Sequence, residues 1–510
     1  MQTEVLIVGA GPTGLALACQ LQRYGIDFMI VDRNAGTTPH SKAIGVQART
    51  LEIYEQIGLA DGLIPSGTIA ERARMLEGGK IRGEVDLSGI GKGMSPYPFL
   101  LLVEQGKHEK LLHDHIIRNG GRVEWQTELV NFSQNDAAVT ATVRTADGET
   151  SAITAKYIVG CDGAGSRVRQ GLGLEFGGST LERLFYVADV EIDWEFSHDS
   201  LYVCLAANTI TAFFPMTGSD RNFRIVGTFP EGHEGEPGGI KYDEIERKII
   251  TDTELNLDIV GMNWFSVYKV HSRHAERFSL GRCFLAGDSA HIHTPAGAQG
   301  MNTGIQDGYN LAWKLAAVLR HGSSGEILTT YSEERLENAT RLLRTTDRFF
   351  QLGSSPNAFI SFLRTKIVPF VANGLVSVDA VQRAIFSLVS QTGIRYRASA
   401  LSKGDDSFRV KAGDRMPWFE VDGQSIYDRL REPKFHLLIF DDGRGETAER
   451  ESEIHRFVDV NRMPLYPHIA DRFGSTESFQ VLLRPDNYIG LIEQATVSEN
   501  VGGYIKKVLA

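Results

Sequence analysis

Cysteine is scarce in this chain of 510 residues, and no two cysteines lie close together in the sequence. Cys19, Cys161, Cys204 and Cys283 form no CxxC pair, which argues against a disulfide framework and against a zinc site. Four small buried side chains are the simpler interpretation of these cysteines. We therefore expect a protein of a reducing compartment, the cytoplasm, without a bound metal ion.

Long basic runs are also missing, and the formal net charge is −11. This charge argues against nucleic acid or an anionic membrane surface as the main partner. The apolar start at residues 5–21 is interrupted by glycine and proline and follows no basic segment, so it does not have the pattern of a signal peptide. No other stretch has the roughly 20 apolar residues that a membrane span requires. We expect no membrane partner, and a homodimer is one of the oligomeric states that the sequence leaves open.

The N-terminal residues have the pattern of a βαβ unit. Residues 4–8 (EVLIV) form a short apolar run that stops at glycine and predicts a buried parallel strand. Residues 13–24 carry apolar side chains at helical spacing, and residues 28–31 (FMIV) predict a second buried strand. Strand, glycine turn, helix and strand follow one another as in a dinucleotide-binding unit.

The turn of this unit carries the first motif, GxGxxG. Gly9 permits a tight turn, Gly11 lets backbone N–H groups approach a pyrophosphate, and Gly14 allows the helix to pack closely on the strand. Asp32 stands at the end of the second predicted strand and can accept hydrogen bonds from an adenosine ribose. Together these residues predict binding of a dinucleotide cofactor.

Two further motifs follow predicted strands. Asp162 follows the strand KYIVG, where a simple turn competes with an ion pair between Asp162 and Arg169 beside a pyrophosphate and nicotinamide groove. Asp288 follows the strand CFLAG, where its carboxylate can accept a hydrogen bond from a sugar-alcohol hydroxyl. The glycine-rich loop at residues 294–302 then leads into a long predicted helix, whose N-terminus can stabilise the negative charge of a reduced flavin.

In their order and spacing, the three motifs resemble those of the para-hydroxybenzoate hydroxylase group of flavin monooxygenases, and most closely its phenol and polyketide hydroxylase branch. Residues 286–315 (AGDSAHIHTPAGAQGMNTGIQDGYNLAWKL) carry the most specific part of the resemblance. Residues 41–43 (SKA), 49–50 (RT) and 103–105 (VEQ) also match. The resemblance extends over the whole chain and is weakest over residues 180–265.

The resemblance implies that FAD is bound non-covalently by two sets of residues. The set that holds the cofactor is Gly9, Gly11, Pro12, Thr13, Gly14, Asp32, Arg33, Lys42, Gln105, Asp162 and Asp288. The set that lines the flavin ring is Pro295, Gly297, Gly300, Met301 and Asn302. Lys42 stands where many relatives have arginine, which keeps a cation near the cofactor but loses a bidentate contact.

The fold class implied is α/β, with a Rossmann-like FAD-binding domain, an inserted sheet-rich substrate domain and a C-terminal thioredoxin-like domain. The FAD-binding domain comprises residues 1–77, 100–175 and 276–400 with a helical extension. The substrate domain comprises residues 78–99 and 176–275.

The third predicted domain comprises residues 402–510. It resembles the C-terminal domain of the branch through residues 412–415 (AGDR) and 484–486 (RPD), and Asn487 stands where relatives usually have glycine. This domain contains no cysteine, which excludes thiol chemistry. Because every cofactor motif precedes residue 320, a chain that ends near Leu401 is expected to bind FAD.

The activity that the resemblance implies is aromatic hydroxylation. In the family, NADPH or NADH reduces the flavin, O₂ adds at its C4a carbon to give a hydroperoxyflavin, and one oxygen atom is transferred to an electron-rich ring. A phenolic or polycyclic substrate is therefore expected. For its pocket the candidates are Phe213, Phe214, Pro215 and Met216, with ordinary core packing as the equal alternative. We assign no catalytic residue.

Other functions fit less well. His291 and His293 beside the third motif are interpreted as structural rather than as proton-transfer residues. A flavin halogenase would need a WxWxIP segment, and a Baeyer–Villiger enzyme would need a second GxGxxG motif; the sequence has neither. A nicotinamide dehydrogenase would leave the region of Asp288 without a role. A non-catalytic flavin-binding protein, or a flavoenzyme of the same fold with different chemistry, stays open as an alternative.

Overall fold

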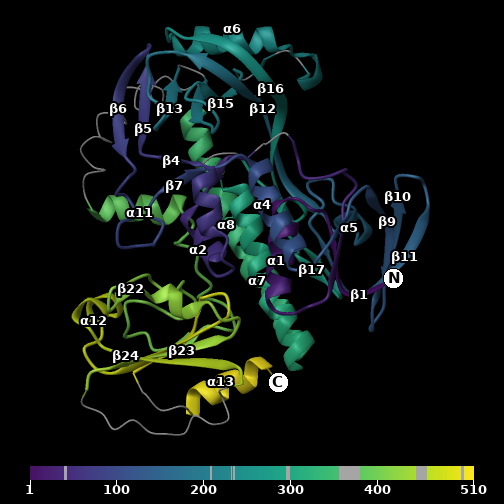
Figure 1. Cartoon of the computed structure of the whole chain (residues 1–510), viewed down its shortest axis with the longest axis vertical. Coiled ribbons are helices and arrows are strands. Elements are labelled where there is room, and N and C mark those ends of the chain that lie inside the picture. The colour runs from purple at the N-terminus through teal and green to yellow at the C-terminus, as the bar shows by residue number, and fades with distance from the viewer. Residues whose placement is uncertain are drawn as a thin grey trace.

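A computed structural model describes residues 1–509 apart from 40–42, 207–208, 231, 234–235, 295–298, 355–378, 444–455 and 495–498. Figure 1 shows a central body, a second sheet at the top and the C-terminal domain at the bottom, coloured yellow. The α-helices described are α1 (Pro12–Arg23), α2 (Ala48–Glu55), α3 (Ala60–Leu63), α4 (Gln105–Arg118), α5 (Arg167–Gly171), α6 (Tyr242–Thr253), α7 (Gly300–His321), α8 (Thr329–Ser354), α11 (Asp379–Val389), α12 (Pro467–Phe473) and α13 (Glu499–Leu509).

The central body is built on a sheet with strand order β17-β18-β11-β1-β2-β8, to which β10 and β9 add as a hairpin on β11. Its strands are β1 (Gln2–Val8), β2 (Phe28–Val31), β8 (Val123–Glu124), β9 (Thr127–Gln134), β10 (Val139–Thr145), β11 (Thr150–Gly160), β17 (Ser279–Leu280) and β18 (Cys283–Leu285). β1 runs parallel to β2 and β11, and β11 runs parallel to β18. The carboxyl ends of β1, β11 and β18 therefore meet at one edge, which brings the three predicted motifs together.

The second sheet has the order β19-β16-β12-β15-β14-β13-β5-β6. Its strands are β5 (Arg72–Glu77), β6 (Lys80–Asp86), β12 (Phe176–Asp193), β13 (Ser200–Leu205), β14 (Ile210–Pro215), β15 (Asn222–Thr228), β16 (Asp258–Ala275) and β19 (His291–Ile292). The amphipathic helix α6 buries Ile245 and Ile249 in the core on one face of this sheet. The sheet extends beyond the predicted residues 78–99 and 176–275, because β5 pairs with β13 and β19 pairs with β16.

The C-terminal domain contains a five-stranded mixed sheet of order β20-β26-β25-β23-β24. Its strands are β20 (Lys403–Gly404), β23 (Phe435–Asp441), β24 (Val458–Pro464), β25 (Phe479–Leu483) and β26 (Ile489–Glu493), with a small hairpin of β21 (Glu420–Val421) and β22 (Gln424–Ser425). Side chains alternate along β23: Leu438 and Phe440 enter the domain's own core, whereas Phe435 and Leu437 join the core of the central body. This domain is therefore packed continuously against the rest of the chain, and its thioredoxin-like character stays a prediction.

A small third sheet joins the parts of the central body. It consists of β3 (Gly45–Val46), β7 (Leu100–Leu102) and β4 (Thr68–Ala70). Among the residues described, no helix is long and apolar enough to cross a membrane.

Candidate functional site

The turn after β1 and the first turn of α1 are packed so closely that two positions accept only glycine. Gly9 has a φ of 106°, and a Cβ there would lie 2.3 Å from the carbonyl oxygen of Cys161. A Cβ on Gly14 would lie 2.0 Å from the carbonyl oxygen of Gly9. Gly11 differs, because a Cβ there would meet no atom within 4 Å. The tight glycines hold the turn in shape, and open space lies at Gly11, where the sequence places the pyrophosphate.

Among the described residues, two helix N-termini at this edge have no side-chain cap. α1 begins at Pro12, which lacks an N–H group, and α7 begins at Gly300; neither helix has a side-chain cap or an acidic residue in its first turn. Uncapped first-turn N–H groups carry partial positive charge and attract an anion. The edge therefore offers two separate places for negative charge.

Asp32 is held in one orientation by backbone N–H groups. Ala10 N–H donates to its Oδ2 at 2.7 Å, and Asn34 N–H donates to its Oδ1 at 2.8 Å. Each carboxylate oxygen keeps further acceptor capacity, which suits a ribose diol. The neighbouring Arg33 is exposed.

Gln105 begins α4 and lies beside the chain segment that leads to β3. Its Oε1 accepts a hydrogen bond from Ala43 N–H at 3.3 Å, and its Nε2 donates to Glu109 Oε1 at 2.8 Å. The other oxygen of Glu109 accepts from Thr38 N–H at 2.7 Å. Burial raises the pKa of Glu109. Gln105 and Glu109 thus hold Ala43 and Thr38, which lie on either side of residues 40–42 in the sequence. Residues 40–42, which include Lys42, are outside the described residues.

Thr13 is a packing residue that joins three elements. Its hydroxyl oxygen would lie 2.4 Å from a Cβ on Gly287 and 2.2 Å from a Cβ on Gly304, so both positions need glycine. Gly287 begins the short helix η3 (Gly287–Ser289), in which the side chain of Asp288 is exposed. This contact sets Asp288 at the same edge as α1 and α7.

Asn302 is fully buried, and its side chain is engaged with protein groups. Its Oδ1 accepts from Gln47 N–H at 2.9 Å and from the Thr50 hydroxyl at 2.7 Å, and its Nδ2 donates to Gly45 O at 2.9 Å. Asn302 therefore clamps β3 and α2 onto the first turn of α7. Its predicted contact with the flavin stays a prediction, and the side chain already has this structural task.

Met301 touches a buried pair of polar rings. His108 Nδ1 lies 3.3 Å from Met301 Sδ, and His108 Nε2 lies 2.5 Å from the hydroxyl of Tyr54. Burial lowers the pKa of His108 to about 4, so this ring is neutral at pH 7. Of the other residues predicted to line the flavin, Gly300 lies beside the His293 ring, whereas Pro295 and Gly297 fall outside the described residues.

Asp162 caps a helix and does not pair with Arg169. Its carboxylate accepts hydrogen bonds from the Ser166 hydroxyl at 2.5 Å and from Arg167 N–H at 2.6 Å at the start of α5. Burial raises its pKa despite these bonds. Arg169 donates instead to Ser289 O at 2.9 Å and to Ala164 O at 2.6 Å, and its guanidinium lies 3.8 Å from the centre of the Phe176 ring. The ion pair considered from the sequence does not form, because α5 offers Asp162 nearer donors.

Asp307 is a buried charge that sequence reasoning missed. It accepts hydrogen bonds from Gly287 N–H at 2.9 Å, from His291 at 2.7 Å and from Arg335 at 2.6 Å. Burial opposes its ionisation, but Arg335 and His291 outweigh burial and lower the pKa of Asp307. This pairing agrees with a structural role for His291. The available signal was a single acidic residue within the long predicted helix that follows the third motif.

The four residues predicted to line a substrate pocket divide between two faces of β14. Phe213 is fully buried in the core beneath α6 and packs against Trp194 with ring centres 4.9 Å apart. Phe214 and Met216 lie on the opposite face, in a cluster with Ile44 of the central body. The reason is the two-residue alternation of a strand, which also turns the buried Pro215 to the side of Phe213.

On that second face, the sheet carries an ion pair whose arginine also contacts the segment that leads to β3. Arg224 makes two hydrogen bonds of 2.7 Å to Asp189 and donates a third to Ala43 O at 3.1 Å. Phe185 and Tyr268 stack beside it with ring centres 6.1 Å apart. An aromatic and apolar face with one charged pair therefore meets residues 43–44.

Comparison with known proteins identifies the family. Residues 2–346 match the family model described as an FAD binding domain. The chain belongs to this FAD-binding family. A flavin-dependent monooxygenase of Mycobacteroides abscessus is 32% identical over 507 residues, which cover 96% of this chain and 97% of that protein.

Solved structures agree with this assignment. An anhydrotetracycline hydroxylase of Streptomyces rimosus is 27% identical with a TM-score of 0.79, covering 100% of this chain and 99% of that one. A Diels–Alderase from the biosynthetic pathway of pyrroindomycins is 26% identical with a TM-score of 0.76, covering 99% of each. The resemblance inferred from the three motifs and the α/β fold class are confirmed.

The residues of this FAD-binding protein fit the cofactor. The open space at Gly11 and the uncapped start of α1 suit a pyrophosphate, and the fixed carboxylate of Asp32 suits a ribose. The exposed Asp288 suits the ribityl hydroxyls, and the uncapped start of α7 suits the flavin ring, which becomes anionic on reduction.

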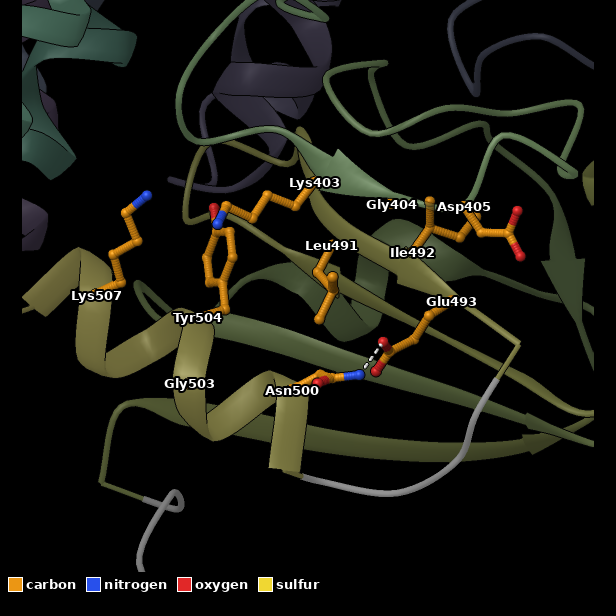
Figure 2. Close-up of a pocket in the computed structure, with 10 residues that line it drawn as sticks. All are labelled: Lys403, Gly404, Asp405, Leu491, Ile492, Glu493, Asn500, Gly503, Tyr504 and Lys507. Carbon is orange, nitrogen blue, oxygen red and sulfur yellow. Dashed lines mark hydrogen bonds between the residues drawn. The ribbon is translucent and has the colours of Figure 1, made fainter.

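A separate cavity of about 480 Å³ lies on the C-terminal domain, between β26 and α13. Figure 2 shows Lys403, Tyr504 and Lys507 on one side of it and a hydrogen bond from Asn500 to Glu493, 2.7 Å long, on the other. None of its lining residues belongs to the FAD site.

Proposed function

We propose that the chain is an FAD-dependent monooxygenase that hydroxylates a phenolic or polycyclic aromatic compound with O₂ and NADPH or NADH. The observation that carries the proposal is the convergence of three distant segments, after β1, β11 and β18, on one edge that fits FAD. The solved structures with this fold include the anhydrotetracycline hydroxylase, which supports a substrate with several fused rings. Four unpaired cysteines support a cytoplasmic location.

Protein groups in this enzyme position the reactants. The N–H groups at the start of α1 and the carboxylates of Asp32 and Asp288 hold FAD by its pyrophosphate, ribose and ribityl parts. The start of α7 stabilises negative charge on the flavin ring. When bound, FAD supplies the transfer of electrons from the nicotinamide and of one oxygen atom from O₂ to the aromatic ring.

The substrate side is formed by the face of the second sheet that carries Phe214, Met216 and the Arg224–Asp189 pair. Aromatic and apolar side chains suit a planar ring system, because they bury its faces without requiring hydrogen bonds. Arg224 also connects this face to the segment that leads to β3, because it donates a hydrogen bond of 3.1 Å to Ala43 O. This hydrogen bond holds the proposed substrate face against the segment that leads to β3.

The test is oxygen incorporation by the purified holoprotein. The holoprotein is incubated with NADPH or NADH and each of a panel of phenols and polycyclic phenols under ¹⁸O₂. The molecular masses of the products are then measured by mass spectrometry. We expect at least one compound to gain one ¹⁸O atom and to accelerate oxidation of the nicotinamide. The same mixtures without O₂ serve as the control.

The alternative is a flavoprotein of this fold with other chemistry, and the likeness to a Diels–Alderase favours that candidate over a non-catalytic one. Conversion of a compound in the absence of O₂, with no gain of oxygen, would identify it. Flavin that is bound but reduced by neither nicotinamide would instead indicate a non-catalytic flavin-binding protein.

A further inference from the structure

Two sequence motifs of the C-terminal domain, residues 412–415 and 484–486, have no part in the proposed reaction. The fold brings them side by side through the residues that follow them: Gly413 N–H donates to Ile489 O at 2.7 Å, and Met416 N–H donates to Asn487 O at 2.9 Å. They form one continuous edge of the domain, which faces the central body.

This edge holds α2 through buried charges. Arg415 Nη1 donates to Glu52 Oε1 at 2.9 Å, and Arg49 Nη2 donates to Asp486 O at 2.9 Å. Within α2, Arg49 Nη1 donates to Glu52 Oε2 at 3.0 Å. Arg49, Glu52 and Asp486 are at most 2% exposed. Each motif therefore supplies one contact to the same short helix.

Arg49 also bridges the C-terminal domain and α7 directly. Its guanidinium lies 5.3 Å from the ring centre of Tyr488 and 5.6 Å from that of Tyr309, which belongs to α7. The attraction between a cation and an aromatic ring is stronger in a desolvated site, so Arg49 interacts favourably with both rings.

The opposite side of α2 is attached to the cofactor end of α7. Thr50, the residue after Arg49, donates its hydroxyl hydrogen bond to Asn302, and Gln47 N–H donates to the same oxygen. A continuous set of buried contacts thus leads from Arg415 through Glu52, Arg49 and Thr50 to the first turn of α7.

We propose that the two C-terminal motifs position the FAD-binding end of α7 by holding α2 against Asn302. The C-terminal domain is then a structural part of the cofactor site, although it contributes no residue to the cofactor itself. The inference rests on FAD binding and is independent of the reaction that the bound FAD performs.

The test compares two arginines of the C-terminal domain in the full-length protein. Arg415→Met removes the contact with Glu52, the bonds to Met94 O at 3.0 Å and to Thr392 O at 3.3 Å, and the bond to the Tyr427 hydroxyl. The matched control is Arg472→Met, because Arg472 donates to Gly93 O, next to Met94, at 3.1 Å and makes no hydrogen bond to α2 among the described residues. FAD affinity of the deflavinated chains, the visible circular dichroism of bound FAD and the guanidinium midpoint are measured for both.

We expect Arg415→Met to weaken FAD binding between about 2-fold and about 30-fold, the usual range for coupling through packed networks, and to change the visible dichroism. Arg415→Lys should restore most of the affinity, and Arg472→Met should stay within about 2-fold of the parent chain. Unchanged affinity and dichroism in folded Arg415→Met would overturn the proposal, as would equal losses in both variants. If Arg415→Met does not fold, Glu52→Gln tests the same contact, and unchanged FAD affinity there has the same meaning.

Discussion

Replacing Arg484 with methionine should destabilise the whole protein, because this arginine completes a buried charge network. Its guanidinium donates to Glu334 on α8 at 2.6 and 3.1 Å and to Asp486 at 3.0 and 2.5 Å. Lys314 on α7 also donates to Glu334, at 2.8 Å. Two cations and two carboxylates, all at most 1% exposed, therefore balance across the interface of the C-terminal domain.

The expected loss is large because the variant leaves a buried charge without compensation. Removal of one partner from a buried ion pair typically costs about 3–5 kcal/mol, whereas a methionine of similar length keeps most of the packing. The double variant Arg484→Met, Glu334→Met restores the balance of one cation and one carboxylate. It should be more stable than Arg484→Met alone, which would make the coupling between the two sites measurable.

The dependence of stability on pH provides a second test of this network. Burial opposes ionisation of Glu334, but Arg484 and Lys314 outweigh burial and hold its pKa far below the ordinary value of 4.5. A carboxyl with a lowered pKa stabilises the fold above its ordinary pKa, and this stabilisation is lost as the pH falls below that value. The parent chain should therefore lose stability more steeply than Arg484→Met below about pH 4.5.

Guanidinium unfolding, followed by the fluorescence of Trp313 and the other tryptophans, measures both effects. Trp313 reports on the network, because its Nε1 donates to Asp486 at 3.0 Å and the Arg484 guanidinium lies 5.2 Å from its ring centre. A loss below about 1 kcal/mol at neutral pH would show that the network contributes little and would refute the reasoning.

Three further outcomes are expected. Acid precipitation should release all FAD, because binding is predicted to be non-covalent; flavin retained in the pellet would contradict this. Asp288→Ala should weaken FAD binding by about 1.5–3 kcal/mol, and Asp162→Ala by less, because Asp162 caps α5; calorimetric titration with FAD compares them, and equal losses would count against the assignment. Asn487→Gly should change the unfolding free energy by no more than roughly 1 kcal/mol, because asparagine tolerates its φ of 59°; a larger change in guanidinium unfolding would show another role.

Local patterns predicted most elements of the central body. The strand predicted at residues 28–31 is β2 without change, and the helix predicted at residues 13–24 is α1, Pro12–Arg23. These elements are local, because hydrophobic spacing and glycine stops determine where they begin and end. Strand pairing is not local: β5 lies within residues 1–77, which the sequence assigns to the FAD-binding domain, but it pairs with β13, which begins only at Ser200.

The cofactor motifs could be found in the sequence because backbone sterics demand particular residues there. Gly9 and Gly14 leave no room for a side chain, so their spacing signals the turn. The roles of polar side chains were harder to predict. Asn302 and Asp162 stand at the predicted motifs, yet their oxygens are occupied by α2 and α5, and only three-dimensional neighbours decide such partners.

The C-terminal domain shows the same limit on a larger scale. A polar stretch at residues 402–406 separates this domain in the sequence, and because every cofactor motif precedes residue 320, a chain ending near Leu401 is predicted to bind FAD. However, Phe435 and Leu437 of β23 enter the core of the central body, and Arg484 neutralises Glu334 there. A strand pattern shows that two faces are apolar but not which neighbour covers each face. We now expect such a truncated chain to expose apolar surface and a buried charge.

Helix α7 explains why residues 286–315 are the most specific stretch of the sequence. Asn302 in its first turn holds β3 and α2, and Gly304 and Gly308 let the helix approach α1 so closely that added Cβ atoms would lie 2.2 Å from Thr13 and 3.1 Å from Leu17. Further along, Asp307 binds Arg335, and Lys314 faces Glu334 at the C-terminal interface. Every side of the helix thus meets a different partner, and each partner requires a different residue type. A helix with one solvent-exposed face has positions that accept many residue types. In α7 residues 302–317 are all buried, so such positions begin only at Val318.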